Sequence, residues 1–218
     1  MVGERDIDKW DYLFYHITVV EFIYKQSFST KTRGNPMWKH DKLDDVQISL
    51  LDQNIISIGG EIDSGTALYV REALLRLMGK GSPPVKVLIT SDGGSVRFGL
   101  NIYDGLKYYA GEKTGVVLGI AHSMAAVILQ ACQKRQCMRH SCILIHHVST
   151  MNVGLDALRN PAKMAKIKED LEEDQARIYK ILSDRTGKSV DAISAECAKD
   201  QSMNSENALE FGLIDEVV

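Results

Sequence analysis

The sequence predicts an α/β fold in which a mostly parallel sheet is flanked by helices. From about residue 45 onward, short runs of β-branched residues alternate with longer stretches that have helical periodicity. Several of these runs end at glycine or a small polar residue directly before the next helix, which is typical of strand–helix units with parallel strands. With 218 residues, of which 44% are hydrophobic, the chain is long enough for one sizeable globular domain.

Each expected element has its own signal. Strands rich in Val and Ile are expected at residues 54–60 (NIISIGG), 85–90 (VKVLIT), 114–120 (TGVVLGI) and 142–147 (CILIHH). Helices are expected at residues 65–81, 95–111, 123–133 and 189–200. A long, highly charged helix is expected at residues 161–187, with Pro161 in its first turn. The segment SDGG, residues 91–94, is expected to break the strand before it.

Residues 1–44 differ in character from the rest, and we expect them to form an N-terminal extension before a main domain at residues 45–218. They hold a large share of the aromatic residues of the chain. Residues 17–24 (ITVVEFIY) fit a strand or a short helix, because periodicity does not separate the two. The extension could pack on its own domain, or its aromatic side chains could contact a neighbouring subunit.

The charge balance argues against several classes of partner. A net charge of −3 and a pI near 6.1 give no electrostatic reason to expect nucleic acid or an anionic membrane. No apolar run is long enough to span a bilayer, and charged residues crowd the first eleven positions, where a secretion signal would turn hydrophobic. We therefore expect a cytoplasmic protein whose cysteines are reduced.

The cysteines offer a possible zinc site that we discard. Cys132, Cys137 and Cys142 recur at five-residue intervals and could be combined with His140. Zinc ligands usually come in closely spaced Cys-x-x-Cys pairs, which this spacing lacks. We therefore expect structural thiols, with no metal and no cofactor.

A candidate nucleophile, Ser123, lies between an expected strand and an expected helix, in the stretch GIAHSMAAVILQA. A serine hydroxyl attacks only when a base removes its proton and hydrogen-bond donors stabilise the resulting oxyanion. A strand-to-helix turn exposes the hydroxyl and directs helical N–H groups toward the developing negative charge. Serine is also a common helix cap, so both roles remain open for Ser123 taken alone.

Other polar groups are expected near Ser123, because the carboxyl ends of parallel strands meet at one edge of a sheet. The two glycines of residues 91–94 allow the backbone to approach a ligand closely. His146 directly follows an expected strand and is favoured as the general base over its neighbour His147, which must point to the other side. His122 adjoins the serine, but adjacent side chains diverge at such a turn. The acid of a triad cannot be chosen among 29 acidic residues by chemistry alone.

From about residue 46 to the C-terminus, the chain resembles the proteolytic subunit of the Clp protease, the ClpP family. That family has a strand ending in a Gly-Gly turn, a helix with an Ile-Tyr-Asp triplet, a serine in an Ala-Ser-Met-type turn, a Lys-Arg pair and a strand ending in Ile-His. An aspartate and a tail containing Gly-Leu-Ile/Val-Asp follow. The matching residues are 93–94 (GG), 102–104 (IYD), 122–124 (HSM), 134–135 (KR), 145–146 (IH), Asp200 and 207–215 (NALEFGLID).

The resemblance implies a ClpP/crotonase-like fold of repeated β-β-α units with a protruding handle helix, whose handle region covers residues 148–186. It implies a serine endopeptidase that works through an acyl-enzyme, with Ser123 as the nucleophile, His146 as the general base and Asp200 as the acid that orients it. Backbone N–H groups of Gly94 and Met124 would form the oxyanion hole.

The resemblance also implies assembly and partners. Heptameric rings, stacked as a tetradecamer, would enclose a chamber for unfolded polypeptides, and a Clp-type AAA+ ATPase would supply them. Two departures bear on these expectations. Lys86 and Leu88 stand where the family has aromatic residues that dock the ATPase, which argues against that partner. Asp92 replaces the usual proline of the glycine turn, and we expect its side chain to point away from the oxyanion.

Two alternatives to a peptidase belong to other classes. One is a catalytically silent or scaffolding ClpP-like subunit, although such subunits typically lose a triad residue and this chain keeps Ser123, His146 and Asp200. The other is a crotonase-type acyl-CoA enzyme, which also uses glycine-turn amides as an oxyanion hole. The order Ser, His, Asp along the chain is not the pattern of that class.

Overall fold

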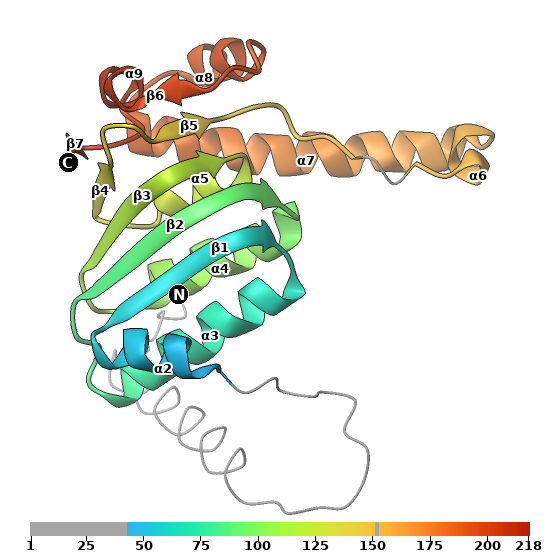
Figure 1. The fold of residues 1–218 in the computed structure, drawn as a ribbon. Helices are drawn as coiled ribbons and strands as arrows, with labels where there is room; N and C mark the ends of the chain where they lie inside the picture. The colour runs from blue at the N-terminus through green and yellow to red at the C-terminus, as the bar shows by residue number, and fades with distance from the viewer. Residues whose placement is uncertain (1–42, 151–152) are drawn as a thin grey trace, which may run out of the picture. The chain divides into compact units, whose positions relative to one another are not determined.

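The computed structural model of the chain describes residues 43–150 and 153–218, which belong to one compact unit (Figure 1). The expected N-terminal extension, residues 1–44, lies outside the described residues except for its last two positions. The predictions for residues 17–24 and for an arm that contacts a neighbouring subunit therefore stay predictions.

Helices and strands alternate from α2 to β4, as the sequence predicts, whereas β4 and β5 follow one another and so do α6, α7 and α8. The helices are α2 (Asp45–Asp52), α3 (Ser64–Gly79), α4 (Val96–Tyr108), α5 (Met124–Leu129), α6 (Leu155–Leu158), α7 (Pro161–Thr186), α8 (Val190–Cys197) and α9 (Ser205–Phe211). The strands are β1 (Ile55–Ile62), β2 (Val85–Gly94), β3 (Lys113–His122), β4 (Lys134–Cys137), β5 (Cys142–Leu144), β6 (Met203–Asn204) and β7 (Glu216–Val217).

These strands form one mostly parallel sheet. Strands β1, β2, β3, β4 and β7 lie in that order, while β5 pairs with β3 and carries β6 on its other side. All pairings in the described residues are parallel except that of β5 with β6. Helices α3 and α4 cover one face of β1–β3 (Figure 1). The predicted fold class, a parallel-rich sheet flanked by helices, is confirmed.

Burial along β2 shows how the sequence produces this arrangement. Val85, Val87 and Ile89 are buried, while Lys86 and Thr90 between and after them are exposed. This alternation is that of a strand with one face on the core and the other toward solvent. All six residues of α5 are buried, so this short helix lies inside the core at the end of β3.

The expected break at residues 91–94 is wrong, because β2 runs through this segment to Gly94. Gly93 and Gly94 remain in register with Glu61 and Ile62 of β1. The strand is bent instead of broken: its register with β3 shifts between Ile89 and Ser91. Both glycines have a positive φ, 96° and 148°, which lets the strand bend without ending.

Other boundaries also differ from the expected ones. The helix expected at 123–133 ends at Leu129, and the strand expected at 142–147 ends at Leu144, so that His146 lies two residues beyond it. Strand β4 was not expected, because its sequence KRQC lacks the β-branched residues on which strand prediction depends. The four-residue helix α6 is too short to show helical periodicity.

The long charged helix expected at 161–187 is present as α7. Pro161 occupies its first turn, and the side chain of Asn160 caps it by accepting hydrogen bonds from the next backbone N–H groups. Its buried residues, Ile178 and Leu182, lie in its second half, and its first half extends past the sheet toward α6 (Figure 1). Within residues 43–150 and 153–218, no helix combines the length and apolarity that a membrane span requires.

Candidate active site

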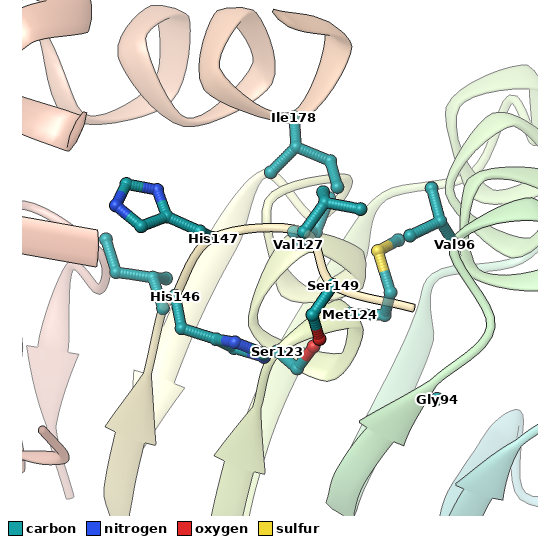
Figure 2. Close-up of a pocket in the computed structure, with 11 residues that line it drawn as sticks. Gly94, Val96, Ser123, Met124, Val127, His146, His147, Ser149 and Ile178 are labelled. Atoms are coloured by element: carbon teal, nitrogen blue, oxygen red, sulfur yellow. The ribbon is translucent and has the colours of Figure 1, made fainter. Parts of the chain in front are cut away.

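A pocket of about 80 Å³ opens beyond the ends of β2, β3 and β5, beside α5 and α7 (Figure 2). The residues that line it are Gly94, Val96, Ser123, Met124, Val127, Ile145, His146, His147, Val148, Ser149 and Ile178. The structure therefore brings together four of the five residues predicted for the site, from three different strand ends. The fifth, Asp200, does not line this pocket.

Ser123 occupies a strained turn between β3 and α5. Its φ is 54° and its ψ is −123°, a combination that non-glycine residues rarely adopt. Its N–H donates to the carbonyl of Leu144 at 2.8 Å, which ties the turn to β5. Ser123 is the N-cap residue of α5, yet its hydroxyl makes no capping hydrogen bond. The helix-cap role of the side chain is therefore excluded, and strain of this kind is common at functional sites.

Gly93 allows the bent end of β2 to touch the serine turn. A Cβ atom at this position would lie 2.6 Å from the Ser123 Cβ and 2.8 Å from the His122 carbonyl oxygen. Both distances are too short for any side chain, so only glycine fits. The sequence signal was the Gly-Gly pair, but the pair does not reveal that its first member packs on the serine itself.

Ser91 holds the bend of β2 from inside and was missed by sequence reasoning. Its side chain is buried, its hydroxyl donates to the Gly60 carbonyl at 2.5 Å, and the same oxygen accepts from the Gly93 N–H at 3.0 Å. The available signal in the sequence was a serine that continues the alternating inward positions of Val85, Val87 and Ile89. These bonds fix the backbone that leads to Gly94, one of the two predicted oxyanion-hole donors.

His146 is half-buried, and its ring points toward Ser123 in Figure 2. No hydrogen bond joins the two side chains in the described residues. Its neighbour His147 turns to the other side, where Nδ1 lies 2.6 Å from the Tyr179 hydroxyl. The other predicted oxyanion-hole donor, the Met124 N–H at the start of α5, makes no backbone hydrogen bond within the described residues.

Asp200 is exposed, in the loop between α8 and β6, with a positive φ of 49°. No hydrogen bond or ion pair connects it to His146 within the described residues. The pairing of β5 with β6 joins Cys142 to Asn204 and Ile143 to Met203, and it does not extend to His146 or Asp200 within the described residues.

The expectation that His122 diverges from the serine agrees with its contacts, which are to residues outside the pocket. The Asp92 carboxylate, with a side chain 85% exposed, lies 3.3 Å from His122 Nδ1, so Asp92 points away from the pocket as expected. Within the described residues, no group of three or more His, Cys, Asp or Glu side chains could hold a metal ion.

The arrangement combines a hydroxyl, an imidazole and backbone N–H groups around one pocket. A hydroxyl without a hydrogen-bond partner can be activated by an imidazole beside it, and amides at a strand–helix junction can stabilise negative charge on a carbonyl oxygen. These are the components required for acyl transfer.

Known proteins and one protein family match most of this chain. The family model for Clp protease matches residues 39–218. The chain is 31% identical over 179 residues to ATP-dependent Clp protease proteolytic subunit 1 of Salinibacter ruber, covering 80% of this chain and 74% of the relative. It is 32% identical to the ATP-dependent Clp protease proteolytic subunit of Bacteroides fragilis, again over 80% of this chain and 83% of that relative.

A solved structure shares the fold. A point mutant of ClpP1 from Listeria monocytogenes superposes with a TM-score of 0.69 at 23% sequence identity, covering 79% of this chain and 95% of that one. The fold, the family model and the two relatives lead to the same conclusion. This chain belongs to the Clp protease family.

Proposed function

We propose that this chain is a serine endopeptidase of the Clp type, with Ser123 as nucleophile, His146 as general base and Asp200 as the residue that orients His146. The observation that carries the proposal is that Ser123 and His146, which come from different strand ends, line one pocket together with Gly94 and Met124. The strained backbone at Ser123 supports the proposal, and so does its hydroxyl, which makes no capping hydrogen bond to α5.

In this mechanism, His146 takes the Ser123 proton as the serine oxygen attacks the peptide carbonyl. The N–H groups of Gly94 and Met124 stabilise the oxyanion of the tetrahedral intermediate. The protonated His146 then gives its proton to the leaving amine, and water hydrolyses the acyl-enzyme by the reverse sequence of proton transfers. The loop of Asp200 must move toward His146 in this mechanism, because Asp200 is exposed and no hydrogen bond joins it to His146 in the described residues.

The proposal extends to assembly but not to an ATPase. We infer that copies of this chain form heptameric rings that stack into a tetradecameric chamber for unfolded polypeptides. The relatives carry the words ATP-dependent in their names, whereas here Lys86 is exposed where the resemblance calls for an aromatic docking residue. We therefore assign the chain peptide hydrolysis without a specified unfoldase.

Hydrolysis of a fluorogenic peptide tests the catalytic roles. Ser123→Ala and His146→Ala are each expected to lower kcat/KM by about a thousandfold or more, because the two residues act as a unit. Asp200→Asn is expected to lower it by about a hundredfold or more. His140→Ala, which removes an exposed histidine between β4 and β5, is the matched control and should retain full activity.

A silent ring subunit is the second candidate, and the exposed position of Asp200, out of contact with His146, favours it. Hydrolysis by the wild-type chain that the Ser123→Ala variant loses would rule it out. The absence of hydrolysis by a correctly assembled wild-type protein would instead contradict the peptidase. A CoA-thioester hydrolysis assay, run alongside the peptide assay, separates the peptidase and the silent subunit from a crotonase-type enzyme, because only that enzyme would act on the thioester.

A further inference from the structure

Three side chains beside the serine turn but outside the pocket form a second cluster, which the proposed mechanism does not use. His122, at the end of β3, lies between Asp92 from β2 and Cys142 from β5. Its Nδ1 is 3.3 Å from the Asp92 carboxylate, and its Nε2 is 3.5 Å from the Cys142 sulfur. The order is therefore acid, imidazole, thiol, with the two ring nitrogens facing different partners.

This order sets the roles of the two nitrogens. A carboxylate beside Nδ1 favours the tautomer that carries its proton there, because the N–H then faces the negative charge. Nε2 is left with its lone pair directed at the thiol of Cys142. An imidazole in this state can accept the thiol proton, and the resulting thiolate is the nucleophilic form of cysteine.

The Ser202 hydroxyl also approaches Nε2, at 3.4 Å. That separation is long for a hydrogen bond from a hydroxyl, which is usually 2.5–3.0 Å, whereas 3.5 Å is within the range accepted for a sulfur atom. Cys142 is therefore the better placed donor to His122, and Ser202 is a competitor that can be removed by mutation.

The other three cysteines lack this environment. Cys132, Cys137 and Cys197 are buried, and burial raises the pKa of their thiols to about 12, 11 and 11 respectively. Cys142 is only half-buried. The side chain of His122 is 21% exposed and that of Asp92 is 85% exposed, so small molecules in solution can reach the cluster.

We propose that Cys142 is a thiol modification site for small electrophiles such as peroxides and haloacetamides, with His122 as its base and Asp92 as the residue that orients His122. With iodoacetamide, the thiol proton moves to His122 Nε2, a sulfur–carbon bond forms, and iodide leaves. With hydrogen peroxide, a sulfur–oxygen bond forms as the O–O bond breaks. The departing hydroxide takes the proton from His122 and becomes water, while the sulfur is oxidised to sulfenic acid.

Modification of Cys142 is expected to affect Ser123, although this consequence rests on the proposed peptidase function. His122 immediately precedes Ser123, and its carbonyl oxygen lies against Gly93. An adduct on Cys142 would occupy the space beside the His122 ring and displace the turn that carries the nucleophile. The modified protein should therefore hydrolyse peptides more slowly, and a Cys142→Ser variant should be insensitive to the reagent.

The experiment that tests the site does not depend on hydrolysis. The native full chain is treated with limiting iodoacetamide at neutral pH, and the carbamidomethylation of each cysteine is followed over time by peptide mass spectrometry. Cys142 should react about tenfold faster than each of the other cysteines, and the difference should largely vanish in denaturant. His122→Asn should slow the reaction of Cys142 by about tenfold and Asp92→Asn by several-fold, whereas Ser202→Ala should leave it unchanged or faster.

Exposure alone predicts different results. If Cys142 reacts as fast in His122→Asn and in Asp92→Asn as in the wild type, its reactivity comes from accessibility and the proposal is overturned. Asp92 is exposed, so its variant carries the test even where His122→Asn does not fold. Absence of hydrolysis by the wild-type chain, with these labelling differences intact, would reject the peptidase and leave the modification site standing.

Discussion

Gly93 is the residue at which the bend of β2 meets the serine turn. Its φ of 96° costs an L-residue about 1–2 kcal/mol, and a Cβ there would lie 2.6 Å from the Ser123 Cβ. Gly93→Ala must therefore push the bend of β2 away from the turn that carries Ser123. We expect peptide hydrolysis to fall by about a hundredfold or more, since displacements near 1 Å have effects of that size.

Gly79 provides the matched control for that substitution. It ends α3, and nothing lies within 4 Å of the position its Cβ would take. Gly79→Ala should leave hydrolysis unchanged and raise stability slightly, because alanine is the better helix former. Equal activity in the Gly93 and Gly79 variants would contradict the close packing of the two turns.

Ser91 makes a second prediction at the scale of single residues. Ser91→Ala removes a buried hydroxyl that bonds both the Gly60 carbonyl and the Gly93 N–H. The free energy of unfolding is expected to drop by about 1–3 kcal/mol, because the buried Gly93 N–H and the Gly60 carbonyl each lose a partner. Urea denaturation measures this drop, and an unchanged midpoint would show that the hydroxyl does not hold the bend.

Strand β4 is linked to the C-terminal segment by the buried Arg135. Its guanidinium and backbone N–H donate to the Asp215 carboxylate, with bonds of 2.5–3.1 Å, and Nη1 also reaches the Gln130 side chain at 2.7 Å. Burial by itself would raise the pKa of Asp215, but the hydrogen bonds and charge of Arg135 outweigh it and hold that pKa below its ordinary value.

This pair predicts a pH dependence of stability. A lowered pKa in the folded state stabilises the protein above the unfolded pKa near 3.9, and the contribution is lost as the pH falls through the folded value. Asp215→Asn should lower the free energy of unfolding by about 1–3 kcal/mol at neutral pH, less than for a fully buried pair because Asp215 is 39% exposed. The difference from wild type should shrink below about pH 4.

The exposed pair of Asp52 and Lys80 is the control for this experiment. Their side chains are 71% and 47% exposed, so Asp52→Asn should change stability by no more than about 0.5 kcal/mol. Urea denaturation across the pH range measures both variants. A difference between Asp215→Asn and wild type that does not depend on pH would show that the charge of Asp215 is not what stabilises the pair.

Elements with a long periodic or β-branched signal could be predicted from the sequence. Helix α7 and strands β1, β2 and β3 begin within a residue of the positions that their β-branched or helical patterns predict, although β2 extends past its expected end. Strand β4 could not be predicted from the sequence, because its inward residues include Arg135, whose burial depends on Asp215 eighty residues later. No local pattern reports a partner at that distance.

The same distinction holds for the candidate site. Its strand-end residues, Ser123 and His146, could be predicted to converge because parallel strands end at one edge. Asp200 could not be chosen by chemistry. It lies in a loop, so the rule that parallel strands end at one edge does not place it, and only the family resemblance pointed to it. The contacts of His122 with Asp92 and Cys142 depend on the order of three strands in the sheet, which the sequence does not state.

Two exposed apolar side chains on the surface of the molecule lie on α6, beside the start of α7. Leu155 and Leu158 are each 60% exposed, which is unusual for leucines on one short helix. In the proposed double ring, we expect the handle region, residues 148–186, to join the two rings, which gives these leucines a role. Replacing both leucines by glutamate should dissociate the double ring, which sedimentation of the wild-type and variant chains would reveal as about half the particle mass.

The control for assembly is Tyr108→Glu, which places one negative charge, half of that in the double leucine variant, on α4, at a residue that is 62% exposed and lies outside the handle region. It should sediment like the wild type. A wild-type chain that sediments as a monomer or dimer would contradict the chamber itself. Rings that survive the double leucine substitution would show that α6 takes no part in joining them.

Ser123 is the proposed nucleophile, and covalent labelling with a fluorophosphonate probes this role without requiring a peptide substrate. Intact mass should increase by one adduct per chain in the wild type, peptide mapping should place it on Ser123, and His146→Ala should slow the reaction strongly, because an unactivated serine does not react. The Ser123→Ala variant should remain unmodified. An adduct on Ser149, which lines the same pocket, or no adduct on the folded wild-type chain, would contradict the account.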